Sequence, residues 1–331
     1  MIGLAKLAPG EGHVDLAERP ERAPGPGEVV LDVAAAGVCG TDLHIWHGEY
    51  DCVPPVTMGH EVCGTVAELG EGVEDHWRGA RVAVETFFST CGRCVYCRSG
   101  HLSVCDQRRS IGTHVDGGFA PRLVIPARNL HRVPDELSDA AAALTEPLAC
   151  VCNSLLDPAR IRHTDEVLVI GPGAIGLIAA QVASACNTRR VTVRGTERDG
   201  ERLALAETLG FATSVEGAPP AADVVVECSG SGPGIADALR AARRRGRIVQ
   251  MGLRGADVTV PYDLICFHEL TVSAGFASNP HSWRRAATLL RAALVRLAPL
   301  VTEVVPLAEW RRAFEASQAG DGVKYVIDPR G

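Results

Sequence analysis

The sequence predicts an α/β fold in which a β-rich domain is joined to a domain built on a doubly wound parallel sheet. Three observations support this prediction. The first third of the chain has short apolar runs separated by Gly/Pro turns, and after about residue 140 strand patterns alternate with helix patterns. The length, 331 residues, suits roughly two domains of about 100–200 residues each.

The first third favours a compact, barrel-like domain. Its expected strands, Val29–Val33, Thr65–Leu69 and Arg81–Val84, are short, and turns such as Ala23–Gly27 separate segments of this kind. Residues 86–110 interrupt this pattern. They are rich in Cys, Arg and Gly and have too few apolar residues for a core of their own.

The remainder alternates strands and helices, which is typical of right-handed βαβ units around a parallel sheet. A long helix is expected over residues 139–156, after Ser138. The strands expected next are Val167–Ile170, Val191–Val193, Asp223–Glu227, Arg247–Met251 and Leu270–Ala274, and the helices are Ala174–Cys186, Gly200–Leu209 and Gly234–Arg244. The tail is expected to form a helix over 282–297, a strand over 302–305, a helix over 307–319 and a strand over 323–327.

Composition argues against several classes of protein. The net charge is −7, and the nearest approach to a basic patch is Arg243–Arg245 with Arg247, which we expect at a solvated helix end, so a nucleic-acid partner is not expected. No run of about 18 apolar residues predicts a membrane span, and Met1–Pro9 lacks the features of a signal peptide. Twelve cysteines without an export signal indicate metal binding or catalysis in a reducing compartment, so we expect the cytoplasm.

Four cysteines are closely spaced in the segment that interrupts the strands. Cys91, Cys94, Cys97 and Cys105 follow the pattern C-x2-C-x2-C-x7-C. Four thiolates suit a tetrahedral Zn²⁺ ion, and an iron–sulfur cluster is the alternative. Since all four ligands would come from the protein, we predict a structural zinc site.

A second candidate metal site lies upstream. Cys39 and His60 are plausible zinc ligands, and a catalytic zinc needs about three protein ligands and an open position. The third ligand could be Glu61 or Glu146. Glu146 stands in an apolar stretch, where an unpaired carboxylate would be costly.

A glycine-rich segment follows the strand expected at Val167–Ile170. It reads Gly171, Pro172, Gly173, Ala174, Ile175 and Gly176, and it opens an apolar helix. In this setting G-x-G-x-x-G predicts a dinucleotide site, because the glycines allow a tight turn and close approach of the pyrophosphate to a helix N-terminus.

An acidic residue is expected about 20 residues further on, where it would bind the ribose 2′-hydroxyl. Glu197 stands 21 residues after Gly176 and favours NAD, because its charge would repel a 2′-phosphate. Arg194 and Arg198 flank it, and either guanidinium could accept that phosphate. NADP therefore stays open as the alternative.

With these motifs in place, the chain resembles the zinc-dependent medium-chain dehydrogenases, in particular the sorbitol, butanediol and L-threonine dehydrogenase branch. The resemblance extends from Pro24–Val30 through Cys39–His44, Gly59–Glu61 and Glu146–Leu148 to Val323–Pro329. It implies a GroES-like catalytic domain over 1–147 with a zinc lobe at 86–110, a Rossmann domain over 148–276, and a return to the catalytic domain over 277–331. It also implies a homodimer or homotetramer.

The resemblance also implies roles for individual residues. Cys39 and His60 would bind the catalytic zinc, with Glu146 beside it directly or through water, and Glu61 could exchange onto the metal. Thr41 and His44 would form a proton relay. The glycine segment, Glu197, Arg198, Arg202 and Cys228 would contact the cofactor.

The reaction implied is hydride transfer between NAD(P) and a secondary alcohol such as a polyol, sugar alcohol or cyclitol. An amino alcohol, such as L-threonine or an aminocyclitol, is the alternative substrate. A zinc-free quinone reductase of the same fold and a regulatory protein that binds zinc and NAD(P) without catalysis are further alternatives. The intact ligand set argues against the first, and Thr41 with His44 against the second.

Overall fold

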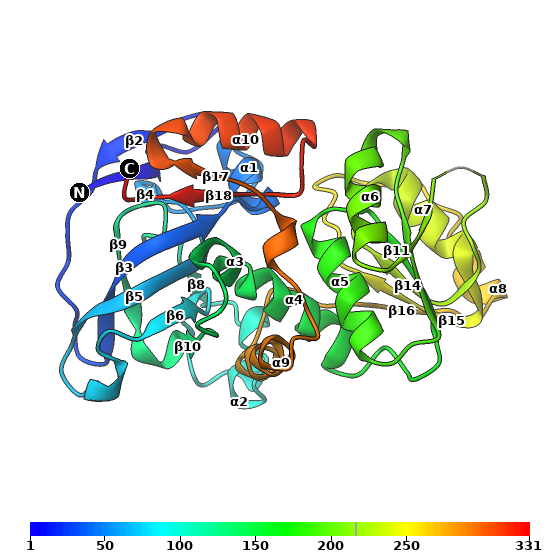
Figure 1. The fold of residues 1–331 in the computed structure, drawn as a ribbon, viewed down its shortest axis with the longest axis horizontal. Coiled ribbons are helices and arrows are strands. Elements are labelled where there is room, and N and C mark those ends of the chain that lie inside the picture. The colour runs from blue at the N-terminus through cyan, green and yellow to red at the C-terminus, as the bar shows by residue number, and fades with distance from the viewer. Residues whose placement is uncertain (216) are drawn as a thin grey trace. The chain divides into compact units, whose positions relative to one another are not determined.

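The computed structural model describes residues 1–215 and 217–331. They form two compact units, Met1–Glu146 with Leu300–Gly331, and Pro147–Pro299. We call these unit 1 and unit 2 and describe each by itself (Figure 1). Within the described residues, no helix is both long enough and apolar enough to cross a membrane.

Unit 1 is rich in β-strands. These are β1 (Ile2–Lys6), β2 (Val14–Glu18), β3 (Glu28–Gly37), β4 (Val56–Thr57), β5 (Glu61–Leu69), β6 (Arg81–Val84), β7 (Phe87–Ser89), β8 (Arg109–Ser110), β9 (Arg122–Pro126), β10 (Leu130–Arg132), β17 (Val301–Pro306) and β18 (Lys324–Asp328). The main sheet has the order β10-β6-β5-β3-β18-β17, and β9 also pairs with β3. Smaller sheets have the order β2-β1-β4 and β7-β8.

Strand β3 organises unit 1, because it pairs with β5, β9 and β18. Its alternate residues Val29, Leu31 and Val33 are buried in one apolar cluster with residues of β5 and β6. At its far end Gly37 pairs with Glu61 of β5 and with Val326 of β18. The ends of three strands therefore meet beside Cys39.

The helices of unit 1 are short. They are α1 (Gly40–Trp46), α2 (Val95–Arg98), α3 (Asp139–Ala143) and α10 (Trp310–Ala319), and α4 (Thr145–Leu156) begins here and continues into unit 2. The helix expected over 139–156 is thus two helices separated by Leu144. Ser138 caps the first, since its side chain accepts a hydrogen bond from Ala141 N.

Unit 2 contains one sheet of six parallel strands. They are β11 (Glu166–Ile170), β12 (Arg190–Arg194), β13 (Ala212–Ser214), β14 (Ala222–Glu227), β15 (Ala242–Gln250) and β16 (Thr271–Ala274). The order is β13-β12-β11-β14-β15-β16, which is the doubly wound order that binds dinucleotides at its switch point. The helices are α5 (Ala174–Ala185), α6 (Gly200–Thr208), α7 (Gly232–Ala241), α8 (Leu264–Phe267) and α9 (Pro280–Arg291). The parallel-sheet prediction is confirmed.

Two details differ from expectation. Arg243–Arg245 and Arg247 lie in β15 and not at a helix end, because α7 ends at Ala241 and the chain pairs with β14 from Ala242 onward. The chain returns to unit 1 at Leu300, whereas the sequence places this boundary at residue 277. Contacts within unit 2 explain the later return: Asn279 donates to Asn153 at 2.7 Å, and Gln181 accepts from the Arg296 amide at 2.7 Å.

Candidate active site

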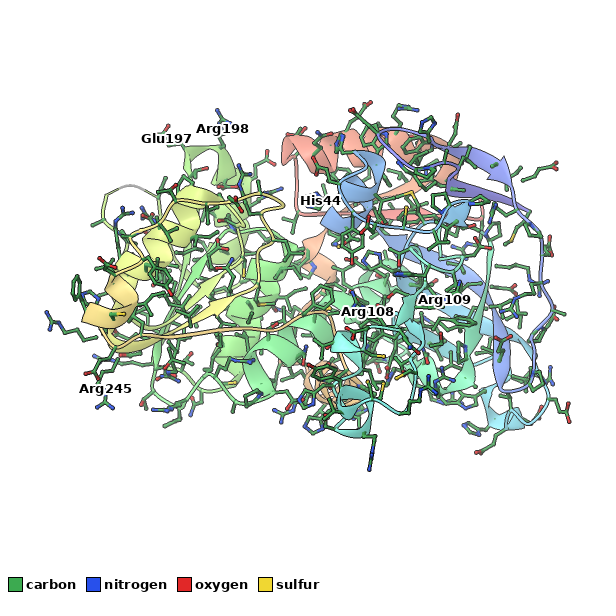
Figure 2. The ribbon with its side chains drawn as sticks, turned by 180° about the vertical axis from the view of Figure 1, so that it is seen from behind. His44, Arg108, Arg109, Glu197, Arg198 and Arg245 are labelled. Carbon is green, nitrogen blue, oxygen red and sulfur yellow. The ribbon has the colours of Figure 1, made fainter. Side chains whose placement is uncertain are left out.

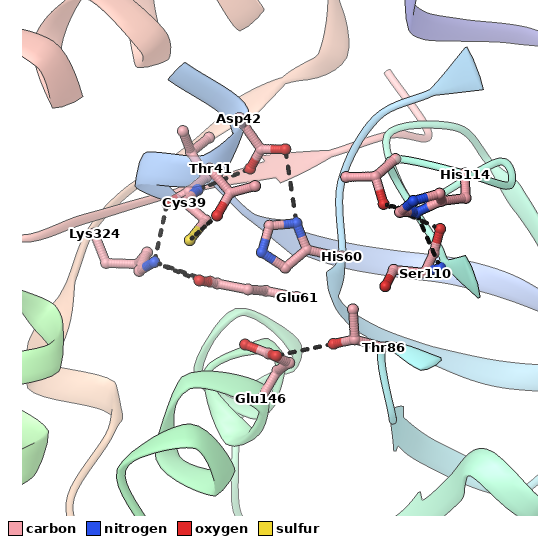
Figure 3. Close-up of polar contacts among 12 residues, drawn as sticks. Cys39, Thr41, Asp42, His60, Glu61, Thr86, Ser110, His114, Glu146 and Lys324 are labelled. Carbon is pink, nitrogen blue, oxygen red and sulfur yellow. Dashed lines mark hydrogen bonds and ion pairs between the residues drawn. The ribbon is translucent and has the colours of Figure 1, made fainter. Parts of the chain in front are cut away.

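Three candidate ligands of the second metal site meet in unit 1 (Figure 3). Cys39 precedes α1, and His60 and Glu61 stand at the start of β5. One ligand atom from each lies within 4.8 Å of the others. The β3–β5 register creates this group, and Gly37 is required there, because a Cβ would overlap the Glu61 carboxylate.

His60 is oriented by a buried carboxylate. Its Nδ1 lies 3.8 Å from Asp42 Oδ1, and neither buried atom has a hydrogen-bond partner in the described residues. The other oxygen of Asp42 accepts from Cys39 N at 2.9 Å. The second ring nitrogen of His60 faces Cys39 and Glu61 (Figure 3). This is the arrangement of a metal-binding histidine whose other nitrogen faces a carboxylate.

Glu61 is paired with a lysine from the last strand. Lys324 Nζ donates to both carboxylate oxygens, at 2.8 and 2.9 Å, and to Val38 O at 2.9 Å. Burial opposes the charge on Lys324, but the carboxylate of Glu61 and the thiol of Cys39 more than offset it, so the lysine pKa is raised. Glu61 is therefore fixed in position by Lys324 beside the other candidate ligands.

Glu146 lies in the first turn of α4, just after the interruption at Leu144. Its Oε1 accepts a hydrogen bond from Thr86 Oγ1 at 2.9 Å, and both side chains are buried. Burial opposes the charged form of the His60 imidazole, but Asp42, then Cys39 and finally Glu146 raise its pKa above the ordinary value. The structure thus brings both candidate third ligands to the cluster, but it is an oxygen of Glu61 that lies within 4.8 Å of Cys39 and His60.

The charges of this cluster suit a cation. Cys39, Asp42, Glu61 and Glu146 bring one thiol and three carboxyl groups into a largely buried site, where Lys324 pairs with Glu61. A buried surplus of negative charge is costly unless a cation neutralises it. Sulfur, imidazole nitrogen and carboxylate oxygen are the ligand types of zinc, so these residues fit that ion.

The two candidate relay residues occupy the same short helix. Thr41 Oγ1 lies 3.9 Å from Cys39 Sγ, so Thr41 borders the cluster. His44 is partly exposed, and its Nδ1 lies 2.7 Å from Glu49 Oε2. No hydrogen bond joins Thr41 to His44 in the described chain, so the structure places one residue at the cluster and the other near solvent.

The four cysteines of the lobe also meet. Their sulfur atoms lie within 4.8 Å of one another, and Cys91 Sγ is 3.9 Å from Cys97 Sγ. A Zn–S bond near 2.3 Å in tetrahedral geometry implies an S–S separation of about 3.8 Å. The amides of Arg93 and Cys94 lower the pKa of the Cys91 thiol to about 6, which favours the thiolate. The four residues fit a closed zinc site.

The glycine segment in unit 2 has the geometry that the motif requires. Gly171 has φ +97°, in the left-handed region that favours glycine. A Cβ at Gly176 would overlap the Gly171 carbonyl oxygen, whereas a Cβ at Gly173 would meet nothing within 4 Å. Ala174 and Ile175 begin α5, and Pro172 lies against Gly195. The open space at Gly173, before a helix N-terminus, fits a pyrophosphate.

The other candidate cofactor residues differ in their surroundings. Glu197 and Arg198 are exposed in a short 3-10 helix, Glu197–Asp199, after β12 (Figure 2), and Arg202 NH1 lies 3.5 Å from Asp199. Arg194 is buried, and its guanidinium donates hydrogen bonds to Ser214 Oγ at 3.0 Å and to Gly217 O at 2.8 Å. These contacts already use the donors that would otherwise bind a 2′-phosphate. Cys228 follows β14, and burial together with Glu227 raises the pKa of its thiol.

Four residues of the site were not assigned from the sequence: Asp42, Glu49, Thr86 and Lys324. Asp42 stands inside the Cys39–His44 motif, and its place three residues after Cys39 was a usable signal for a cap. Lys324 is 263 residues from Glu61, so no local pattern connects them.

Comparisons with known proteins identify the family of the chain. The alcohol dehydrogenase GroES-like domain matches residues 25–135, and the zinc-binding dehydrogenase model matches residues 174–292. The chain is 35% identical to a sorbitol dehydrogenase of Halalkalibacterium halodurans and 32% identical to an L-threonine 3-dehydrogenase of Cutibacterium acnes, with 99% of each protein covered. Its fold matches the NADP-bound structure of a candidate zinc-binding dehydrogenase from Sinorhizobium meliloti, with a TM-score of 0.89, 32% identity and 99% of both chains covered.

The agreement covers the whole chain and includes both predicted domain types. The predicted fold class, a GroES-like domain with a Rossmann domain, is confirmed. Because relatives above 30% identity are matched over 99% of their length, the chain belongs to the zinc-dependent medium-chain dehydrogenases, a family of oxidoreductases.

Proposed function

We propose that this protein oxidises a secondary alcohol of the polyol type to a ketone with NAD as hydride acceptor. The observation that carries the proposal is the buried group of Cys39, His60 and Glu61 with Thr41 beside it. A purely structural metal site would have no need of a hydroxyl at its edge. The sorbitol dehydrogenase relative supports a polyol substrate.

Two zinc ions are part of the proposal. Cys91, Cys94, Cys97 and Cys105 would hold the structural ion. Cys39, His60 and Glu61 would hold the catalytic ion, with Glu146 as the neighbouring carboxylate. A zinc ion in such an open site acts as a Lewis acid that lowers the pKa of a bound hydroxyl.

The protein residues handle the proton. Thr41 Oγ1 is at the edge of the cluster and would accept a hydrogen bond from the substrate hydroxyl. His44 is partly exposed, and its Nδ1 lies 2.7 Å from Glu49 Oε2, so it would pass the proton on toward solvent. Thr41 and His44 thus lie on the same short helix α1, the first at the cluster and the second near solvent.

A zinc count tests the two sites separately. Cys39→Ser should retain one zinc per chain and lose activity, whereas Cys97→Ser should lose the lobe ion and show increased proteolysis within residues 90–108. Cys266→Ser, at an exposed cysteine of α8, is the control and should retain two. Full activity of Cys39→Ser at one zinc per chain would refute the catalytic assignment.

Variants at the two glutamates identify the third ligand. Glu61→Gln should weaken zinc binding at this site more than Glu146→Gln, because the Glu61 oxygen is the one within 4.8 Å of both other ligands. Zinc affinity is measured by competition with a chelator. The reverse order of affinities would transfer the role to Glu146.

The preference for NAD rests on Glu197, whose exposed carboxylate would bind the ribose hydroxyls. Glu197→Ala should lower kcat/KM for NAD and raise the NADP-to-NAD ratio, because the neighbouring Arg198 would remain for a 2′-phosphate. Wild-type enzyme that prefers NADP would contradict the assignment.

The substrate class needs a direct comparison. The L-threonine 3-dehydrogenase relative supports an amino alcohol as the second candidate. A panel of polyols, cyclitols, amino alcohols and simple secondary alcohols, followed at 340 nm, separates the two. Turnover confined to amino alcohols would favour the second candidate.

We also propose a homodimer or homotetramer in the cytoplasm. Strand β16 is an edge of the described sheet, and Val272, Phe267 and Tyr262 near it are exposed, at 47%, 72% and 67%. An exposed edge strand with apolar neighbours suits pairing with a second copy. Twelve free cysteines suit a reducing compartment.

A further inference from the structure

Unit 2 contains a charged cavity. It has a volume of about 850 Å³ and is lined by six arginines, namely Arg160, Arg162, Arg243, Arg244, Arg245 and Arg247. The carboxylates that line it are three: Asp165, Asp223 and Glu269. The lining therefore carries a surplus of positive charge, although the whole chain carries −7.

This cavity is separate from the dinucleotide segment. Its walls come from the start of β11, β14, β15 and β16, whereas the glycine segment follows the end of β11. The strands are parallel, so their starts and ends lie at opposite edges of the sheet. Figure 2 shows Arg245 well away from Glu197 and Arg198 in unit 2.

The aspartates of the cavity already form ion pairs with arginines. Arg243 donates to Asp223 at 3.0 Å and to Glu166, and Arg247 donates to Asp165 at 2.6 Å. These ion pairs join the strand starts and stabilise the cavity walls. They also leave little negative charge to neutralise the remaining arginines.

Four guanidinium groups remain without strong neutralisation. Arg160 donates to the carbonyl oxygens of Ser154 and Ala274, at 2.5 and 3.1 Å, and remains charged although burial lowers its pKa. Within the described chain, the side chains of Arg162 and Arg244 form no ion pair. Arg245 and Glu269 are 3.5 Å apart, but both are highly exposed, at 84% and 75%, so their attraction is weak.

The backbone at Arg245 is strained. Its φ of 61° lies in the left-handed region, which costs a residue with a Cβ on the order of 1 kcal/mol. The register of β14 with β15 shifts beside it, and Arg245 N donates to His268 O at 2.6 Å. Such strain is common at ligand sites. Here it occurs among three consecutive arginines of the cavity wall.

We propose that this cavity binds a small anion that carries several phosphate groups. A guanidinium group forms two parallel hydrogen bonds with the oxygens of one phosphate. The unneutralised charges come from two segments, 160–162 and 244–245, and an anion with several phosphate groups would contact both. No aromatic side chain is among the described residues that line the cavity, so a nucleobase would find no stacking partner. The anion itself is therefore what the site recognises.

Calorimetric titration with inorganic tripolyphosphate tests the site. The holoenzyme is saturated with NAD so that the glycine segment is occupied, the ionic strength is held constant, and the zinc content is measured afterwards. We expect tripolyphosphate to bind at least tenfold more tightly than sulfate. We expect Arg244→Ala/Arg245→Ala to weaken it at least tenfold.

The matched control is Arg284→Ala/Arg291→Ala, which removes two exposed arginines of α9 in the same unit and should leave binding unchanged. Absence of tripolyphosphate binding, or equal losses in both variants, would overturn the proposal. If Arg244→Ala/Arg245→Ala changes only the oligomeric state, measured by light scattering, the patch is instead a contact between copies. The test measures binding and not turnover, so its result is independent of the proposed dehydrogenase function.

Discussion

At the residue scale, the ion pair between Lys324 and Glu61 is a strong determinant of the site. Both side chains are buried, at 7% and 1% exposure. Removing one partner of a buried pair leaves an uncompensated charge. We expect Lys324→Met in the zinc-free protein, compared with the zinc-free wild type, to lower the free energy of unfolding by about 3 kcal/mol, measured by urea denaturation.

A double variant separates the pair from other effects of the substitution. Lys324→Met/Glu61→Gln should recover part of the loss, because the unpaired carboxylate is then absent. Arg312→Met, which removes the exposed partner of Glu303, is the control and should change the stability little. Lys324→Met with wild-type stability would contradict this description of the site.

His114 should make stability depend on pH. Its Nδ1 accepts hydrogen bonds from Ser110 N and from Thr113 Oγ1, at 3.3 and 2.8 Å, which requires the neutral ring. Burial, with the charges of Arg108 and Arg109, lowers its pKa below 6.5. Below pH 6.5 the unfolded chain takes up a proton that the folded protein resists. Its stabilising effect is therefore complete above that pH and is lost as the pH falls through the folded pKa.

Two measurements check this sign. The NMR titration of the His114 ring should have a midpoint below 6.5. The decrease in unfolding free energy between about pH 7 and pH 5 should be smaller in His114→Gln than in the wild type. A midpoint above 6.5, or an unchanged pH dependence in the variant, would show that the ring is not held neutral.

At the scale of elements, two glycines in the turn from β11 to α5 have different roles: Gly173 is expected to matter for cofactor binding and Gly176 for stability. An alanine at Gly173 meets no neighbouring atom, so Gly173→Ala should keep the wild-type Tm but bind NAD at least tenfold more weakly, because its methyl group occupies the pyrophosphate position. Gly176→Ala should instead lower stability by about 1–3 kcal/mol, because its methyl group overlaps the Gly171 carbonyl oxygen.

Scanning calorimetry and an NAD titration of both variants provide the comparison, each serving as the control for the other. Equal NAD affinity in Gly173→Ala and the wild type would remove this segment from the cofactor site. An unchanged Tm in Gly176→Ala would mean that helix α5 does not need close contact with the turn.

The prediction from local sequence was wrong for two elements, for the same physical reason. The Ala-rich pattern of 139–156 favours one long helix, yet the helix is interrupted at Leu144. Just after this interruption, Glu146 accepts a hydrogen bond from Thr86. Arg243 and Arg244 continue a helical pattern, yet they lie in β15, in the irregular stretch between its paired residues Ala242 and Arg247. Propensity is a weak preference, and tertiary pairing overrides it near element ends.

At the scale of the whole molecule, the exposed edge of β16 predicts association of copies. Val272→Lys places a charge on this edge and should shift the protein toward monomer in light scattering. Leu294→Lys, at another exposed apolar residue of unit 2, is the control and should leave the mass unchanged. A wild-type protein that is monomeric at micromolar concentration would contradict the proposal.

Local spacing alone determined much about this protein. The four-cysteine lobe, the glycine turn and the alternation of strands and helices were predictable, because each depends on residues close together in the chain. The grouping of Cys39 with His60 and Glu61 could be predicted for a similar reason, because two short sequence motifs contain these residues.

Only the tertiary structure decided which distant residues complete the site. Lys324 reaches Glu61 across 263 positions, Thr86 reaches Glu146 across 60, and six arginines from two segments form one cavity. Sheet register brings these side chains together, and register depends on the packing of the whole unit. A buried charge also acquires its partner only when the strands assemble, so no local pattern in the sequence could have identified it.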